Sequence, residues 1–182
     1  PKHSIQMSAR KLRYDWFYEL IELHNYDFIL TAHHLNDSIE TFFINLTRST
    51  GIDGLTGIKS INNKVIRPLI PFSKSQLKDY AKENNILWRE DSSNFKNDYL
   101  RNKIRNKILP IFKEIDSDFA INFSKTINRL SESSLILKKH AENFKSTNFQ
   151  IINDEILILK KVLKNLSSVM IFNLFVDYGF KN

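Results

Sequence analysis

Residues 31–57 of the chain read TAHHLNDSIETFFINLTRSTGIDGLTG and directly follow the apolar run FIL at 28–30. The pattern predicts a short strand that passes into a helix, the junction at which open α/β sheets bind ligands. Asn36 is the expected N-cap, and Asp37, Glu40 and Thr41 then share one helical face. Another face carries the apolar stripe expected to be buried, which comprises Ile39, Phe42, Phe43 and Leu46. Both carboxylates are therefore expected to point away from the core.

Two interpretations of this polar cluster stay open from spacing alone. The helix dipole favours acidic residues in a first turn, and histidines at a strand end, here His33 and His34, are often structural. Imidazoles and carboxylates gathered at a strand-to-helix junction also suit a functional site. Three of the four glycines in the chain, at 51, 54 and 57, follow this helix, so backbone freedom is concentrated there.

The composition predicts a globular, cytoplasmic protein. Of its 182 residues 42% are hydrophobic, and 27 Lys and Arg against 20 Asp and Glu give a net charge of +7. That charge favours a polyanionic partner, with an unpartnered basic surface as the alternative. The absence of cysteine excludes disulfides, thiolate zinc sites and cysteine nucleophiles. No apolar run reaches the roughly 20 residues of a membrane span, so no membrane partner is expected.

The segments on either side of the opening stretch predict helices and a short extended excursion. Residues 4–25 have apolar side chains at helical spacing, among them Leu12, Trp16 and Leu23, with Arg10 and Arg13 on another side. These two arginines suit either a phosphate or plain solvation. Residues 58–71 predict a strand-like segment with a turn at 62–63 that holds Arg67 extended. Ser73 and Gln76 predict a capping box for a helix that ends near 84–85.

The later segments predict a basic helix, a long helix and a hairpin. Residues 88–110 contain a DSSN turn and then the cations Arg101, Lys103, Arg105 and Lys107, which alternate with apolar anchors. Because few acidic residues oppose them, a surface facing phosphates is favoured over a solvated face. Residues 118–144 predict one long or two consecutive structural helices. A hairpin around 153–154 and a helix from about 166 towards 178 are expected to follow.

Five motifs together resemble the tRNA(Ile)-lysidine synthetase family, in order and over roughly residues 4–115. They are ARKLRY at 9–14, AHHLNDSIET at 32–41, RSTGIDGLTGI at 48–58, RPLI at 67–70 and DSSNFKNDYLRNKIRNKILP at 91–110. The resemblance implies an N-type ATP pyrophosphatase of α/β class. It places the C-terminal part of a Rossmann-like parallel-sheet adenylation domain at 1–115 and a mainly helical segment, the start of a tRNA-binding domain, at 116–182.

The resemblance also implies a reaction. Family members use ATP, with Mg²⁺, to adenylate the wobble cytidine of the CAU anticodon of tRNA(Ile), and free L-lysine then displaces AMP. A homodimer is compatible with it. The family's glycine-rich SGGxDS loop is not in the sequence, so we expect a fragment that also lacks the C-terminal domains and is inactive by itself. An RNA-binding module without catalysis and a related tRNA-modifying PP-loop ATPase are the alternatives.

Site roles follow from the positions that match the family's motifs. The resemblance assigns catalysis to His33, Asp37 and Arg13, with Arg13 beside the ATP phosphates, and lysine binding to Asp37 and Glu40. It assigns no metal site to the chain itself. The expected tRNA contacts are Arg67, Arg101 and Arg105. The last two are expected on a basic helix apart from the strand end, facing phosphates.

Overall fold

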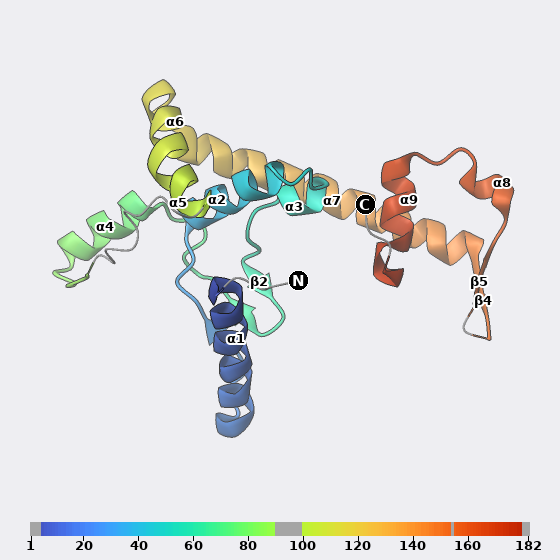
Figure 1. Ribbon diagram of the computed structural model, residues 1–182, viewed down its shortest axis with the longest axis horizontal. Coiled ribbons are helices and arrows are strands. Elements are labelled where there is room, and N and C mark those ends of the chain that lie inside the picture. The colour runs from blue at the N-terminus through green and yellow to red at the C-terminus, as the bar shows by residue number, and fades with distance from the viewer. Residues whose placement is uncertain (1–4, 90–99, 154, 180–182) are drawn as a thin grey trace.

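The computed structural model describes residues 5–89, 100–153 and 155–179 (Figure 1). The first part contains α1 (Ile5–His24), β1 (Ile29–Leu30), α2 (Leu35–Leu46), α3 (Ile52–Leu55), β2 (Ile61–Asn62), β3 (Val65–Ile66) and α4 (Lys74–Glu83). The second part contains α5 (Leu100–Lys103), the π-helical turn η2 (Ile104–Ile108), α6 (Leu109–Ile115), α7 (Phe119–Asn148), β4 (Phe149–Ile152), β5 (Glu155–Ile158), α8 (Lys160–Leu163), α9 (Ser168–Phe175) and the 3-10 turn η3 (Val176–Tyr178). Both the helix predicted at 4–25 and the hairpin around 153–154 are confirmed.

The α/β class is confirmed by a small mixed sheet with strand order β1-β3-β2. β1 pairs in parallel with β3, and Ile29 lies opposite Val65. β2 and β3 form an antiparallel hairpin whose turn places Asn63 at a φ of 51°. This parallel pairing brings the chain after β1, where α2 begins, next to the chain after β3, where Arg67 lies. No described helix is both long and apolar enough to cross a membrane.

The main apolar cluster lies where α2 meets η2, α6 and α7. Its buried members are Leu35, Ile39, Ile104, Leu109 and Phe123. Phe42 and Phe43 of the predicted stripe are half-buried against this cluster, but Leu46 is exposed because it lies in the last turn of α2, beyond the cluster. A second cluster holds Ala141 of α7 against Met170 and Leu174 of α9. In Figure 1 α7 is the long rod that reaches from the first cluster to the second.

Two peripheral helices project from this body (Figure 1). α1 packs through Ile21, which is buried, while Leu12, Trp16 and Leu23, the residues that suggested its apolar side, are exposed. α4 begins at the predicted N-cap, because the Ser73 hydroxyl accepts a hydrogen bond from the backbone N–H of Gln76. None of the residues of α4 is buried.

The glycine-rich loop after α2 closes against the helix it follows. The hydroxyl oxygen of Ser38, a buried residue, accepts a hydrogen bond of 2.9 Å from the N–H of Ile58. Gly57 lies beside that hydroxyl with a φ of +70°, a conformation that L side chains rarely adopt, and a Cβ there would collide with it. Gly51, in contrast, has a φ of −72° and open space around it.

We expect Gly57→Ala to lower the free energy of unfolding by about 1–3 kcal/mol, because strained backbone and overpacking then coincide. Gly51→Ala in the same loop is the matched control. It should cost less than about 1 kcal/mol, since only a weak N-cap preference is lost. Urea unfolding of the two variants and the parent protein measures both effects, and equal losses would contradict this account of the loop.

Candidate active site

A buried carboxylate bound by two arginines is the centre of the site. Glu40 of α2 has no exposed surface. Its Oε1 accepts a hydrogen bond of 2.6 Å from Nε of Arg105, and its Oε2 accepts one of 2.7 Å from Nε of Arg101. Arg105 donates a further bond of 3.0 Å to Oε2. The bond to Glu40 raises the pKa of Arg105 despite burial, so this guanidinium stays charged.

This geometry corrects two predictions. Glu40 points into the molecule rather than away from the core, because two guanidinium groups neutralise it there. Arg101 and Arg105 lie against Asp37 and Glu40 of α2, the helix that follows β1, rather than on a separate surface. They are four residues apart, so they extend from the same side of the α5–η2 segment towards α2. Their contacts with tRNA stay a prediction, as does that of Glu40 with lysine. The predicted DSSN turn at 91–94 lies outside the described residues.

Asp37 lies one turn before Glu40 and is more accessible. Its Oδ2 accepts a hydrogen bond of 3.0 Å from the backbone N–H of His34, the residue that caps α2 in place of the predicted Asn36. Its Oδ1 lies 3.9 Å from terminal nitrogens of Arg101 and Arg105, beyond hydrogen-bonding distance. The Asp37 side chain is 16% exposed. Asp37 therefore keeps one carboxylate oxygen for a cationic or hydrogen-bonding ligand.

His33 and Arg13 lie together in a hollow between α1 and the end of β1. The hollow has a volume of about 350 Å³ and is lined by Arg10, Arg13, Tyr14, Phe17, Leu30, Thr31, Ala32 and His33. The hydroxyl of Tyr14 is buried and has no hydrogen-bond partner among the described residues. The two guanidinium groups can only donate hydrogen bonds, and the unpartnered hydroxyl has one to donate. This hollow therefore suits an anion such as a phosphate.

His33 is neutral in this setting. Its Nδ1 lies 2.9 Å from the Thr31 hydroxyl. Burial lowers its pKa, Asp37 raises it, and the charges of Arg67, Arg10 and Arg101 lower it again, with a net lowering. A neutral imidazole can accept a proton or orient a reacting group, which is the role predicted for His33.

Arg67 is placed differently from what tRNA binding suggests. It is 6% exposed, and its terminal nitrogen donates a hydrogen bond of 2.8 Å to the carbonyl of Lys59. Its Nε is buried without a partner among the described residues. Little of this side chain faces solvent, so its most direct effect is to hold the β2–β3 hairpin and to add positive charge near His33.

A larger cleft opens beside the start of α2, and sequence reasoning missed it. It has a volume of about 790 Å³ and lies between α4, residues 88–89 and the η2–α6 segment. His34, Asn36, Glu40 and Arg105 form the wall that it shares with the site. Asn36 accepts a hydrogen bond of 2.7 Å from the N–H of Lys74 and so fixes the start of α4. The capping box at Ser73 predicted α4, but it gave no indication that α4 forms one wall of a cleft.

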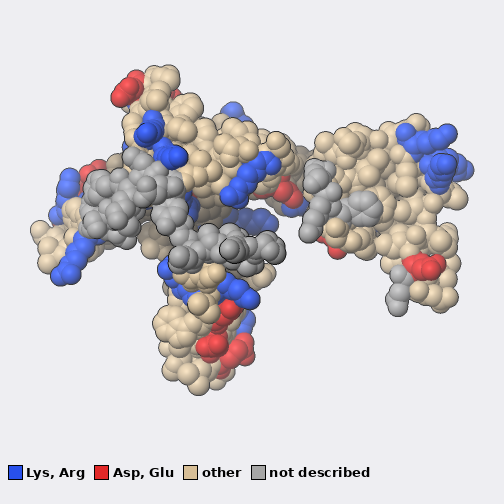
Figure 2. Space-filling model, in the orientation of Figure 1, with Lys and Arg blue, Asp and Glu red and all other residues tan. Residues whose placement is uncertain are grey.

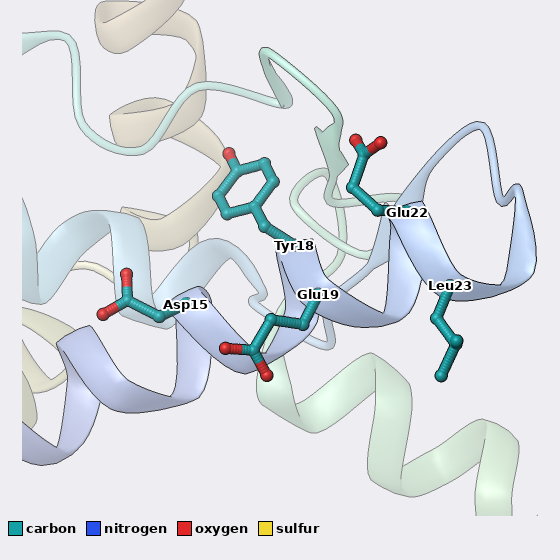
Figure 3. Close-up of a pocket in the computed structure, with 5 residues that line it drawn as sticks. All are labelled: Asp15, Tyr18, Glu19, Glu22 and Leu23. Carbon is teal, nitrogen blue, oxygen red and sulfur yellow. The ribbon is translucent and has the colours of Figure 1, made fainter.

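A third hollow, drawn in Figure 3, is formed by one helix alone. Asp15, Tyr18, Glu19, Glu22 and Leu23 of α1 line it, and Figure 3 shows the three carboxylates spread along the helix. Its described lining holds no cation and comes from a single helix, so it lacks the groups from different elements that converge in a catalytic site. Among residues 5–89, 100–153 and 155–179, no group of three His, Asp or Glu side chains is arranged to hold a metal ion.

Glu40→Gln should lower the free energy of unfolding by about 2–3 kcal/mol. The neutral amide cannot balance the charge of two guanidinium groups. Because the two arginines are partly exposed, the loss of stability is expected at or below the lower end of the range for breaking a fully buried ion pair. Glu22→Gln is the control, since Glu22 is 82% exposed and 3.7 Å from Lys64. It should cost less than about 0.5 kcal/mol. Chemical denaturation that finds equal effects would contradict the role assigned to this ion pair.

The lowered pKa of His33 also predicts a dependence of stability on pH. An unfolded histidine titrates near 6.5, so below that pH the unfolded chain takes up a proton that folded His33 resists. The free energy of unfolding should therefore fall between about pH 7.5 and about pH 5.5, and by less in His33→Gln. His24→Gln removes an exposed imidazole of α1 as the control. An identical pH dependence in His33→Gln and the parent protein would refute the prediction.

Comparison with known proteins identifies a family and several relatives. Residues 1–112 match the model of the PP-loop domain family. The tRNA(Ile)-lysidine synthase of Chlorobaculum tepidum is 41% identical over 131 residues, 72% of this chain and 39% of that protein. The synthase of Bacteroides thetaiotaomicron is 37% identical over 143 residues, 79% of this chain and 34% of that protein. The synthase of Francisella philomiragia is 34% identical over 171 residues, 90% of this chain and 43% of that protein.

The match to the PP-loop domain covers more than half of the chain and includes every site residue described above. The chain spans between 34% and 43% of the length of these three relatives. The chain therefore belongs to the PP-loop family, in the group of the tRNA(Ile)-lysidine synthases.

Proposed function

We propose that this chain carries the catalytic site of an enzyme that joins lysine to the wobble cytidine of the CAU anticodon of tRNA(Ile). ATP would be converted to AMP and pyrophosphate through an adenylated intermediate. The observation on which the proposal depends most is the partly exposed carboxylate of Asp37, next to two arginines and a neutral histidine. The names of the relatives support tRNA modification by a PP-loop ATPase.

ATP, when bound, supplies the group that turns the cytidine oxygen into a leaving group. The hollow lined by Arg10 and Arg13 fits the charge of its phosphates, and the unpartnered Tyr14 hydroxyl can donate to a phosphate oxygen. Arg13 would stabilise the negative charge that develops as pyrophosphate leaves. Mg²⁺ would be held mainly by the phosphates, since the described residues offer no cluster of ligands for it.

We assign two roles to Asp37, which are to bind the ammonium group of lysine and to accept its proton. Its Oδ1 is free of hydrogen bonds to the arginines, so it can accept one from an ammonium group. Both oxygens of Glu40 are already occupied, so we assign Glu40 to holding Arg101 and Arg105 beside Asp37. His33, neutral and next to Asp37, would orient the reacting groups. Attack requires a neutral amine, and Asp37 would accept the proton that the amine loses as its nitrogen bonds to the cytidine and AMP leaves.

Three further features belong to the proposal. The parallel β1–β3 pair would form part of a Rossmann-like sheet, with an adenylation domain up to residue 115 and a tRNA-binding segment after it. Arg101 and Arg105 would meet tRNA phosphates. The enzyme would work in the cytoplasm, where ATP, lysine and tRNA occur together.

Asp37→Asn in the full-length protein should raise the KM for lysine about 10- to 100-fold, because a charge-assisted hydrogen bond to the ammonium is lost. The KM for ATP should change little. AMP release with ATP, lysine and CAU-anticodon tRNA measures both constants, and Asp15→Asn, on the exposed face of α1, is the control. An unchanged lysine KM would refute the role of Asp37. AMP release that never depends on lysine or tRNA in the parent protein would refute the proposed function.

A further inference from the structure

We propose that the cleft between α4 and the η2–α6 segment binds a single-stranded stretch of RNA, with one base stacked on Trp88. This inference rests on the proposed function, because it takes the substrate to be RNA. The cleft has a volume of about 790 Å³, within the range of roughly 300–1,000 Å³ for small-ligand pockets. This is room for one or two nucleotides.

The charge of the cleft favours a polyanion. Lys74 of α4, Arg89 and Lys113 of α6 line it from different elements. Among the described residues of its lining, Glu40 carries the only carboxylate, and Arg101 and Arg105 already neutralise it. Figure 2 shows Lys and Arg side chains spread along α4, which carries Lys74, Lys78 and Lys82. Cations on opposite walls suit a phosphate backbone that passes between them.

Trp88 supplies a surface for a base. Its side chain is 46% exposed at the cleft wall, and it stacks on no other aromatic ring among the described residues. Proteins recognise single-stranded RNA largely by stacking unpaired bases on such aromatic side chains. An acidic peptide would satisfy the lysines equally well, but it would leave the exposed indole without a matching group.

The cleft also leads to the site. His34, Asn36, Glu40 and Arg105 line its inner end, and Asp37 lies next to them on α2. An enzyme that modifies a base must take it out of the helical stack, and a base that leaves the stack needs a pocket at the reacting groups. RNA held between α4 and α6 would place one nucleotide at this inner end.

The outer wall of the cleft can move to admit a strand. α4 has no buried residue, and its start is fixed by the hydrogen bond from the N–H of Lys74 to Asn36 and by that from Leu35 to the carbonyl of Phe72. Few buried contacts and exposed backbone characterise segments that open at low cost. Asn36 therefore sets the rest position of this wall.

Two tryptophan variants of the full-length protein test the inference, because this chain contributes Trp16 and Trp88. Trp16→Phe keeps the fluorescence of Trp88, and the difference between the parent protein and each variant isolates the signal of the replaced tryptophan. Trp88→Phe leaves Trp16, which is 54% exposed on α1 and serves as a matched control. A stem-loop RNA with a CAU anticodon should protect Trp88 from acrylamide quenching and leave Trp16 unaffected. Polyglutamate at equal charge should protect neither.

Affinity measurements separate stacking from charge. Trp88→Ala should weaken binding of the stem-loop about 5- to 100-fold, whereas Trp88→Phe, which keeps a stacking face, should stay within a few-fold of the parent. Lys74→Gln and Lys113→Gln should each reduce the salt slope of log affinity by about 0.7, the value for a contact on a single strand. The KM for ATP should not change in any of these variants.

The outcomes are distinct. RNA binding that leaves Trp88 as quenchable as before, or protection of Trp88 by polyglutamate alone, overturns this inference and leaves the proposed function standing. Protection of Trp16 and Trp88 to the same extent also overturns it, since binding is then not confined to the cleft. Absence of RNA binding by the parent protein overturns the inference and the proposed function together.

Discussion

The ion pairs of Glu40 with Arg101 and Arg105 are the constraint on which the rest of the structure depends. A carboxylate with no exposed surface would be strongly destabilising without partners, and its two partners come from a segment more than 60 residues later in the sequence. The pairs therefore fix how α2 lies against α5 and η2. Leu35, Ile39, Ile104 and Leu109 pack around the same contact. The core and the site thus share one junction, and a change in either alters the other.

This arrangement divides the surroundings of α2 into two sides with different chemistry. On the α1 side, a small hollow lined by Arg10, Arg13 and His33 suits an anionic ligand. On the α4 side, a larger cleft brings cations together with the exposed indole of Trp88. Asp37 is near both, since its charge raises the pKa of His33 in the hollow and its Oδ1 lies 3.9 Å from Arg105 of the cleft wall. The proposed reaction combines a nucleotide, an amine and an RNA base, and a carboxylate close to two binding sites suits it.

The sequence predicted the local elements well because their signals are local. Ser73 with Gln76 specified the start of α4, and apolar periodicity specified α1 and α7. Long-range pairing was not predictable in the same way. Amphipathic patterning treats every charge as outward, so it placed Glu40 in solvent and Arg101 and Arg105 on a separate surface. Leu46 is exposed because it lies in the last turn of α2, beyond the core. α1 packs through Ile21, and the apolar side chains on its other side stay exposed.

The loop after α2 connects this junction to the distant end of the molecule. The Asn45 side chain donates to the carbonyl of Gly54, and the Asp53 carboxylate accepts from Ser134 and lies 2.7 Å from Lys138 of α7. Burial raises the pKa of Asp53, but the hydrogen bonds from Lys138 and Ser134 outweigh it and lower the pKa. The same α7 carries Ala141 of the second cluster, against which α9 packs. Because α7 is one continuous helix, its contact with α3 sets the position of α9 relative to Asp37.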